Sequence, residues 1–292
     1  MKAHDHAESA ALAPRLTKAS RKFYWSPYDY IEWPESIEGA RWYMAPELIS
    51  IYGTEMWEEL DDQQRTRLSH FELGNFFSLT LHGERPLVQG LVHRLHAKSS
   101  GPDITDYLHH FIDEENKHMI MFGEYCNRYI GKVYPDKKVA FGRTYEKGEE
   151  EVAFFCKVLV VEELGDVYNV AMQKDERIAP LVAKLNWVHH RDEARHMAFG
   201  RRFLGELAEH WLATWSEEVT EKFREWLAAY IRSSWADFYN PAMYRDAGLP
   251  KPYDIRVRAM ADPLCRAHRE RVSSPLVEFF ISTGLLVSAP EL

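Results

Sequence analysis

The 292-residue sequence is short of cysteines and has no long apolar run. Its three cysteines, Cys126, Cys156 and Cys265, are an odd number without close spacing, which indicates a reducing compartment and disfavours a CxxC-type zinc site. No stretch approaches the roughly 18 consecutive apolar residues of a transmembrane helix. The N-terminal stretch lacks the apolar region of a secretory signal, so we expect a cytoplasmic protein without membrane contact.

Positive charge is also scarce. Lys and Arg number 36 against 45 Asp and Glu, a net charge of −9, so we expect no general affinity for nucleic acid. The 46% of hydrophobic and 28% of charged residues are ordinary globular values and exclude wholesale disorder. Histidine is plentiful instead, with 14 residues, and it is the first indication of metal chemistry.

The organisation of the chain follows from where prolines and glycines are rare. Apolar residues there recur at steps of three and four, while strand-like alternation is nearly absent, which predicts long amphipathic helices over roughly 55–99, 103–130, 146–174, 177–211 and 214–238. We predict an all-α fold, a single domain with a four-helix-bundle core and extra flanking helices. Residues 47–240 form the bundle, 1–46 a partly disordered N-terminal extension and 241–292 a C-terminal extension packed on the bundle. We expect roughly the first 20 residues to be poorly ordered.

Four of the predicted helices have carboxylates or histidines where a hydrophobic residue belongs. Steps of three and four place the members of each set on one helix face. A carboxylate that faces a core is costly unless it is paired or bound to a metal. Four such helices therefore predict a shared metal centre, with the candidate ligands Glu84, Glu115, His118, Glu162, Glu193 and His196.

The spacing of these residues repeats. Glu84 precedes the Glu-x-x-His pair at Glu115 by 31 residues, and Glu162 precedes the pair at Glu193 by the same 31 residues. A helix, a short turn and a returning helix would bring each lone Glu level with its Glu-x-x-His partner. Two such hairpins that face each other form a two-iron or two-manganese carboxylate site in a four-helix bundle.

Several assignments stay open at this point. Oxygen ligands with imidazole suit iron, with manganese as the alternative metal. Glu163 is a rival to Glu162 because it lies on its own apolar stripe, although the repeat favours Glu162. Glu72 is a rival to Glu84 but breaks the repeat. Any single Glu–His pair could also be a satisfied hydrogen bond in the core.

The segments around these residues resemble the ligand segments of ferritin-like di-iron oxygenases. They read His82-Gly83-Glu84, Asp113-Glu114-Glu115-Asn116-Lys117-His118, Val161-Glu162-Glu163-Leu164 and Asp192-Glu193-Ala194-Arg195-His196-Met197-Ala198-Phe199-Gly200. His189 lies four residues before Glu193 on the same face and can supply a third histidine. This feature is similar to the arylamine N-oxygenases of the p-aminobenzoate N-oxygenase (AurF-like) family. By that resemblance the ligands are Glu84, Glu115, His118, Glu162, His189, Glu193 and His196.

Two further carboxylates are expected to orient the histidines. Many di-iron oxygenases have Asp-Glu in both motifs, and here the first motif has Glu114 in place of that Asp. We expect Asp192 to hydrogen-bond His118 and Glu114 to hydrogen-bond His196 from outside the metal ligands.

The resemblance implies an activity. Two irons would reduce O2 to a peroxo-bridged diferric species that N-oxygenates an aromatic amine to hydroxylamine and then to nitroso or nitro, in secondary metabolism such as antibiotic biosynthesis. The electrons would come from an external ferredoxin or reductase, because the sequence has no nicotinamide or flavin fingerprint. A homodimer is expected by analogy. Substrate-binding residues are not identifiable from the sequence.

Other functions compete with this one. The same ligands would serve a di-iron C–H hydroxylase of a small or carrier-bound substrate, and His189 is the feature that argues against it. A radical-generating ribonucleotide reductase subunit is disfavoured because Phe122 stands where its radical tyrosine would lie, with Tyr125 two turns on. Iron storage is disfavoured because the chain exceeds a minimal bundle and has aromatic-rich flanks.

Overall fold

Four long helices form the core of the molecule. The computed structural model describes residues 6–37, 39–97, 101–136 and 144–292. Its core helices are α3 (Asp62–Arg94), α4 (Pro102–Tyr125), α5 (Glu149–Met172) and α6 (Pro180–Leu212). The long helices predicted from periodicity and the all-α fold are thereby confirmed; the described part of the chain has no strand, and its β-structure is one isolated bridge between Trp42 and Ile178.

Local sequence signals define where the core helices begin. Asp61 caps α3, with reciprocal hydrogen bonds to Gln64 that satisfy two of the free N–H groups of the first turn. Pro102 and Pro180 occupy the first positions of α4 and α6, where the missing N–H costs nothing. The π-helical turn Cys126–Ile130 continues α4 and ends at Gly131, whose φ of +80° favours glycine.

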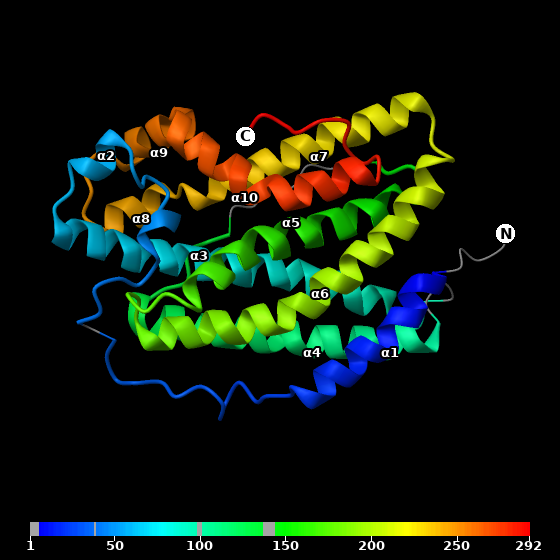
Figure 1. Cartoon of the computed structure of the whole chain (residues 1–292), viewed down its shortest axis with the longest axis horizontal. Coiled ribbons are helices and arrows are strands. Elements are labelled where there is room, and N and C mark those ends of the chain that lie inside the picture. The colour runs from blue at the N-terminus through cyan, green and yellow to red at the C-terminus, as the bar shows by residue number, and fades with distance from the viewer. Residues whose placement is uncertain (1–5, 38, 98–100, 137–143) are drawn as a thin grey trace.

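The core consists of two antiparallel hairpins, α3–α4 and α5–α6, which lie side by side (Figure 1). Each hairpin carries one copy of the repeated Glu…Glu-x-x-His unit. The two hairpins approach closely where Gly83 on α3 lies against Val161 on α5, since a Cβ at Gly83 would come within 2.6 Å of the valine. This contact brings Glu84 and Glu162, one residue further along each helix, to the same level of the bundle.

Shorter helices cover the bundle on one side. Along the upper edge of Figure 1, α7 and α10 lie beside α5, and α8 and α9 continue this layer toward α3. Their bounds are α7 (Glu217–Phe238), α8 (Pro241–Asp246), α9 (Pro252–Ala261) and α10 (Pro263–Ser282), with α2 (Glu55–Glu58) and a short 3-10 helix (Pro46–Leu48) before α3. None of the helices in the described residues is both long and apolar enough to cross a membrane.

The expectation that the first 20 or so residues are poorly ordered is wrong for residues 7–22. They form α1 (Ala7–Lys22), which packs across α4 and α6 and buries Ala13 and Leu16. Polar contacts anchor it as well, because Ser9 hydrogen-bonds Glu206 of α6 and Ser20 accepts a hydrogen bond from Arg195. Little in the sequence indicates this helix, because its apolar residues other than Leu12 and Leu16 are small and some of its attachment comes from side-chain hydrogen bonds.

Candidate metal centre

Seven carboxylate and imidazole groups converge in the interior between the two hairpins. They form two clusters, one of Glu84, His118, His189 and Glu193 and the other of Glu115, Glu162, Glu193 and His196. Each residue offers one ligand atom, and the ligand atoms of a cluster lie within 4.8 Å of one another. All seven side chains are buried. The structure therefore brings together every ligand candidate named from the sequence and its family resemblance.

The first cluster contains two histidines. Oε1 of Glu193 lies 2.9 Å from Nε2 of His189 and 3.2 Å from Nδ1 of His118. Oε1 of Glu84 lies 3.4 Å from the same nitrogen of His189. Two imidazole nitrogens and two carboxylate oxygens thus face one point, which is a ligand set that suits iron or manganese.

The second cluster contains one histidine and is joined to the first by carboxylates. Nδ1 of His196 lies 2.6 Å from Oε1 of Glu115 and 3.1 Å from Oε2 of Glu193. The other oxygen of Glu193 belongs to the first cluster, and Oε2 of Glu115 lies 3.7 Å from Nδ1 of His118. Glu193 consequently belongs to both clusters, and Glu115 of the second cluster also approaches His118 of the first.

Many of these groups lack a hydrogen bond, as expected of side chains that bind metal ions. Most of the ligand atoms are fully buried and make no well-aligned hydrogen bond with the described residues, although histidine and carboxylate groups crowd together. These atoms are both carboxylate oxygens of Glu84 and of Glu115, one oxygen each of Glu162 and Glu193, Nδ1 of His118 and Nε2 of His189. A buried polar atom without a partner costs about 1–3 kcal/mol. So many of them in one place indicate cations as the missing partners.

Proton affinities at the site are strongly perturbed. Burial and the neighbouring carboxylates raise the pKa of Glu84 and of Glu193 well above the ordinary range and that of Glu162 to about 7. Burial, reinforced by the charges of His118 and His196, holds the pKa of His189 well below its ordinary value. A neutral imidazole is the form that binds a metal. Metal binding must therefore displace protons from the carboxyl groups but none from His189.

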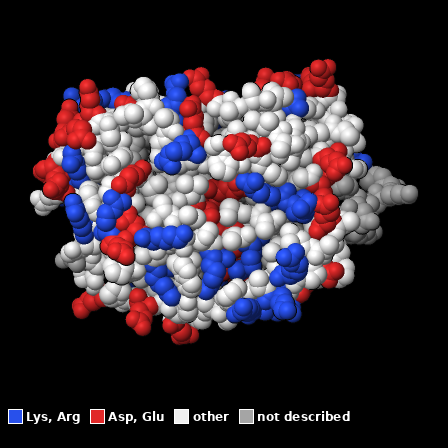
Figure 2. Space-filling view, in the orientation of Figure 1, with Lys and Arg blue, Asp and Glu red and all other residues white. Residues whose placement is uncertain are grey.

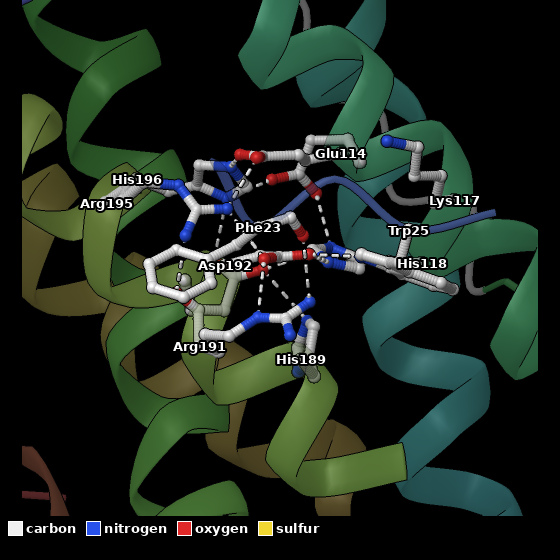
Figure 3. Close-up of polar contacts among 12 residues, drawn as sticks. Phe23, Trp25, Glu114, Lys117, His118, His189, Arg191, Asp192, Arg195 and His196 are labelled. Carbon is white, nitrogen blue, oxygen red and sulfur yellow. Dashed lines mark hydrogen bonds and ion pairs between the residues drawn. The ribbon is translucent and has the colours of Figure 1, made fainter. Parts of the chain in front are cut away.

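Two of the histidines are each contacted by a carboxylate of the other hairpin, on the side of the ring away from the cluster. Figure 3 shows Asp192 of α6 facing His118 of α4, with 3.4 Å between Oδ2 and Nε2. Glu114 of α4 faces His196 of α6 in the same way, with Oε2 2.9 Å from Nε2. In both histidines Nε2 faces the carboxylate and Nδ1 faces the cluster, so the carboxylates hold the tautomer in which Nδ1 is free for a metal.

Arg195 joins the two carboxylates and was not assigned this position from the sequence. Its Nη2 donates to Asp192 at 2.6 Å and to Glu114 at 2.5 Å. Both acceptors are buried, so this guanidinium gives each carboxylate a cationic partner in addition to its histidine. The available signal in the sequence was its spacing, because Arg195 lies three residues after Asp192 and so on the same helix face.

Two other functional contacts were missed. Trp25, which follows α1, donates its Nε1–H to Oδ2 of Asp192 at 2.7 Å (Figure 3). The amide of Asn169 on α5 lies 2.7 Å from Nδ1 of His189. Asn169 shares the helix face of Glu162, so its spacing could have indicated the contact. Nothing in the local sequence around Trp25 could have done so.

The rival residues lie elsewhere. Glu163 points to Arg201, whose Nε donates to it at 2.7 Å, so of the two neighbouring carboxylates it is Glu162 that joins the cluster. Glu72 accepts from the backbone N–H of Ser50 at 2.5 Å, outside both clusters.

A cavity of about 310 Å3 lies between α3 and α5 beneath α7. Thr80 and Leu87 line it from one turn on either side of Glu84, and Val158 and Gly165 do so around Glu162. Most other lining residues are apolar or aromatic; the basic side chains are Lys157 and His82, and the acidic ones are Asp136 and Asp237. The cavity thus borders the helix faces next to two of the ligands.

Comparison with known proteins agrees with this geometry. Residues 6–284 match the family model described as P-aminobenzoate N-oxygenase AurF. The chain is also similar to the uncharacterized proteins Rv0885 of Mycobacterium tuberculosis strain H37Rv and Mb0909 of Mycobacterium bovis, each 24% identical over 264 residues that cover 86% of this chain and 74% of the relative. Because the family model spans nearly the whole sequence and the buried clusters can hold two metal ions, the chain belongs to the p-aminobenzoate N-oxygenase AurF family.

Proposed function

We propose that the protein is a non-haem di-iron monooxygenase that uses O2 to oxidise the nitrogen of an aromatic amine, through the hydroxylamine to the nitroso or nitro product, in secondary metabolism. The observation that carries the proposal is the position of His189. It is buried, faces Glu84 and Glu193, and gives the first cluster a second imidazole. This neutral donor adds no negative charge to the cluster, as the resemblance to arylamine N-oxygenases leads us to expect.

The proposed ligands are the seven residues of the two clusters. They would hold two ions, which we take to be iron, with manganese as the alternative, and Glu193 would serve both because it belongs to both clusters. Two irons bound here would supply the reduction of O2 and the transfer of an oxygen atom to the substrate. Glu114 and Asp192 orient two of the histidine ligands, and Arg195 holds these two carboxylates in place. Phe111 stacks on His196 at 3.9 Å and helps to exclude water.

The cavity between α3 and α5 is the proposed place for the substrate. An engineered cavity of about 150 Å3 holds a benzene ring, so about 310 Å3 leaves room for a substituted ring. Gly165 supports this, because it is buried and yet a Cβ built on it would meet nothing within 4 Å. The lining carries both signs of charge, and Lys157, opposed by Asp136 and Asp237, is the lysine suited to the carboxylate of an acidic amine such as p-aminobenzoate.

The test begins with anaerobic loading of the protein with Fe(II) and a count of the irons bound per chain. Loaded protein is then given O2 and p-aminobenzoate or aniline, and the products are identified by mass spectrometry with 18O-labelled O2. We expect two irons per chain and 18O on the nitrogen of the product. Fewer than two irons would overturn the metal assignment. Two irons with 18O on carbon would replace N-oxygenation by C–H hydroxylation.

A further inference from the structure

A tryptophan connects the candidate metal centre to the surface. Trp25 is 3% exposed, its Nε1–H donates to Asp192, and its ring lies nearly parallel to that of His118, with 6.4 Å between the ring centroids. Asp192 in turn contacts the same histidine. A chain of hydrogen-bonded groups therefore leads from Trp25 through Asp192 to a proposed iron ligand (Figure 3).

The segment around Trp25 carries several exposed aromatic residues. Phe23 is 40% exposed, Tyr24 68% and Tyr28 77%, which is unusual for large apolar rings on one short segment. Exposed aromatic groups gathered in this way mark interaction sites. The exposed rings therefore indicate that the surface above Trp25 contacts another molecule.

Basic side chains are interleaved with these rings. Lys22 and Arg191 lie over the ring of Phe23, at 5.1 and 5.6 Å from its centroid, and Lys184 lies 4.1 Å from that of Tyr30. Figure 2 shows Lys and Arg side chains gathered in the lower half of the view, over α1 and α6. We call this surface the aromatic–basic patch, made of Lys22, Phe23, Tyr24, Tyr28, Lys184 and Arg191.

Two acidic groups of the neighbouring helix α4 are paired with basic residues, and Asp29, an exposed acidic residue within the segment, accepts a hydrogen bond from Ser26. Asp106 on α4 is paired with Arg21 at 3.0 Å, and Asp113 on the same helix with Lys117 at 2.5 Å. The chain as a whole carries a net charge of −9, so a basic surface is a local departure from its overall charge. Such a surface attracts an acidic partner and steers its approach.

We propose that the aromatic–basic patch docks an acidic electron-donor protein of the ferredoxin class, and that electrons reach the metal centre through Trp25, Asp192 and His118. Each transfer oxidises the iron–sulfur cluster of the donor by one electron and reduces one ferric ion to ferrous. Two donor molecules in succession reduce both irons. Trp25 forms and breaks no bond, and its indole nitrogen keeps its proton.

The position of the aromatic–basic patch, next to the metal centre, favours an electron-donor protein over other acidic partners. The rest of the metal centre is enclosed by helices, whereas Trp25 lies one residue after the exposed ring of Tyr24 and three residues before that of Tyr28. A donor on the patch would therefore approach the iron ligands without entering the bundle. This inference rests on the di-iron part of the proposed function but not on the identity of the substrate.

The experiment follows reduction of the diferric protein without substrate or O2. Reduced plant-type [2Fe–2S] ferredoxin is mixed in excess with the iron-loaded chain, and the loss of ferric absorbance is recorded by stopped flow. The dependence on ferredoxin concentration gives an apparent Kd and a limiting rate. For the unaltered chain we expect saturation and a Kd that rises steeply with salt.

Trp25→Phe tests the route. Phenylalanine keeps a ring in place but has no N–H to donate to Asp192, so we expect the limiting rate to fall about tenfold or more with an unchanged Kd. Trp235→Phe is the matched control, because Trp235 is 1% exposed and donates Nε1–H to Ser273 away from the clusters. Iron content and midpoint potential are measured on both variants. Equal rates in the two variants, or a shift in potential that accounts for the slower rate, would overturn the route.

Lys22→Glu/Lys184→Glu tests the docking surface. We expect its Kd for ferredoxin to rise about tenfold or more, with the limiting rate unchanged. Lys222→Glu/Lys251→Glu makes the same change of charge on α7 and before α9, at the opposite edge of Figure 1, and should leave the Kd as it is. Equal effects of the two charge reversals would overturn the docking proposal.

Other outcomes assign the patch differently. If ferredoxin neither binds nor reduces the loaded chain, the proposal fails while the di-iron site stands. If sedimentation shows a dimer that Lys22→Glu/Lys184→Glu dissociates, the patch is an interface between two copies of this chain. If the chain binds no iron, there is no electron acceptor, and the proposed function fails together with this inference.

Discussion

The amide nitrogen of Asn169 lies 2.7 Å from Nδ1 of His189, and the amide oxygen of Asn169 has no hydrogen-bond partner among the described residues. When Nε2 of His189 binds a metal, Nδ1 carries the proton and needs an acceptor. Rotation of the amide by half a turn supplies that acceptor and satisfies the oxygen. Metal binding at His189 therefore fixes the orientation of Asn169.

The substitution Asn169→Leu should remove the hydrogen bond that orients His189. Because Leu cannot accept the proton of Nδ1, we expect iron affinity to fall by about 10- to 100-fold, the usual cost of losing a group behind a ligand. Asn186→Leu is the control, since Asn186 is also buried and its amide donates to the carbonyl of Val182 instead. Competition with a chelator measures both affinities. Equal losses would mean that Asn169 acts by packing.

The substitutions Glu162→Gln and Glu163→Gln test which of these two neighbouring carboxylates binds metal. Glu162 has a raised pKa and an oxygen without a partner, so its amide variant should bind fewer than two irons and yet unfold at a higher temperature when free of metal. Glu163→Gln should keep both irons and lose stability, because it weakens the pair with Arg201. Metal analysis and calorimetry of the metal-free proteins check the prediction. The opposite pattern would make Glu163 the ligand.

Asp192→Asn should weaken the first cluster. The neutral amide no longer holds the His118 tautomer as firmly and leaves Arg195 with one charged partner instead of two, so we expect iron affinity to fall by about 10-fold or more. Asp166→Asn is the comparison, because Asp166 contacts His190 at 2.7 Å, which belongs to neither cluster. If the two variants bind iron alike, Asp192 does not orient His118.

Gly165→Leu should fill the cavity without disturbing the metal ligands. A Cβ at this position meets nothing within 4 Å, so the larger side chain has room and would occupy the space proposed for the substrate. We expect two irons per chain and a KM for the amine raised about tenfold or more, in line with loss of a few contacts. Gly205→Leu, also without neighbours within 4 Å but outside this cavity, should leave KM unchanged.

Glu72 makes stability depend on pH. Its carboxyl is buried beside Ser50, and burial raises its pKa to about 8. The folded state therefore holds a proton that the unfolded state releases near pH 4.3. The contribution to stability is complete at low pH and is lost as the pH rises toward 8, at up to about 1.4 kcal/mol per pH unit.

Glu72→Gln should remove this dependence. The amide keeps the shape of the protonated carboxyl, so the variant should match the metal-free parent near pH 5 and exceed its free energy of unfolding at pH 8.5. Denaturant unfolding at both pH values gives the comparison. Because the clusters also titrate in the metal-free chain, the measured quantity is the difference between variant and parent. A constant difference across this range would contradict the raised pKa.

The sequence alone determined the fold class and the residues of the clusters. Periodicity predicted α3 to α7, because a buried helix face needs apolar residues at steps of three and four. The repeated spacing of 31 residues identified Glu84, Glu115, Glu162 and Glu193, since carboxylates inside apolar stripes are too costly to be accidental. These features are readable because each depends on residues within one helix or one hairpin.

The tertiary structure decided what lies around the clusters. Trp25 and Asp192 are separated by 167 residues, Arg195 and Glu114 by 81, and no periodicity relates them. The helical state of residues 7–22 likewise depends on Glu206 and Arg195 of α6. Local propensity and spacing extend over one helix or hairpin, whereas these contacts form only when distant segments pack together. The residues of the clusters could therefore be predicted from the sequence, whereas the groups that contact and connect them depend on the fold.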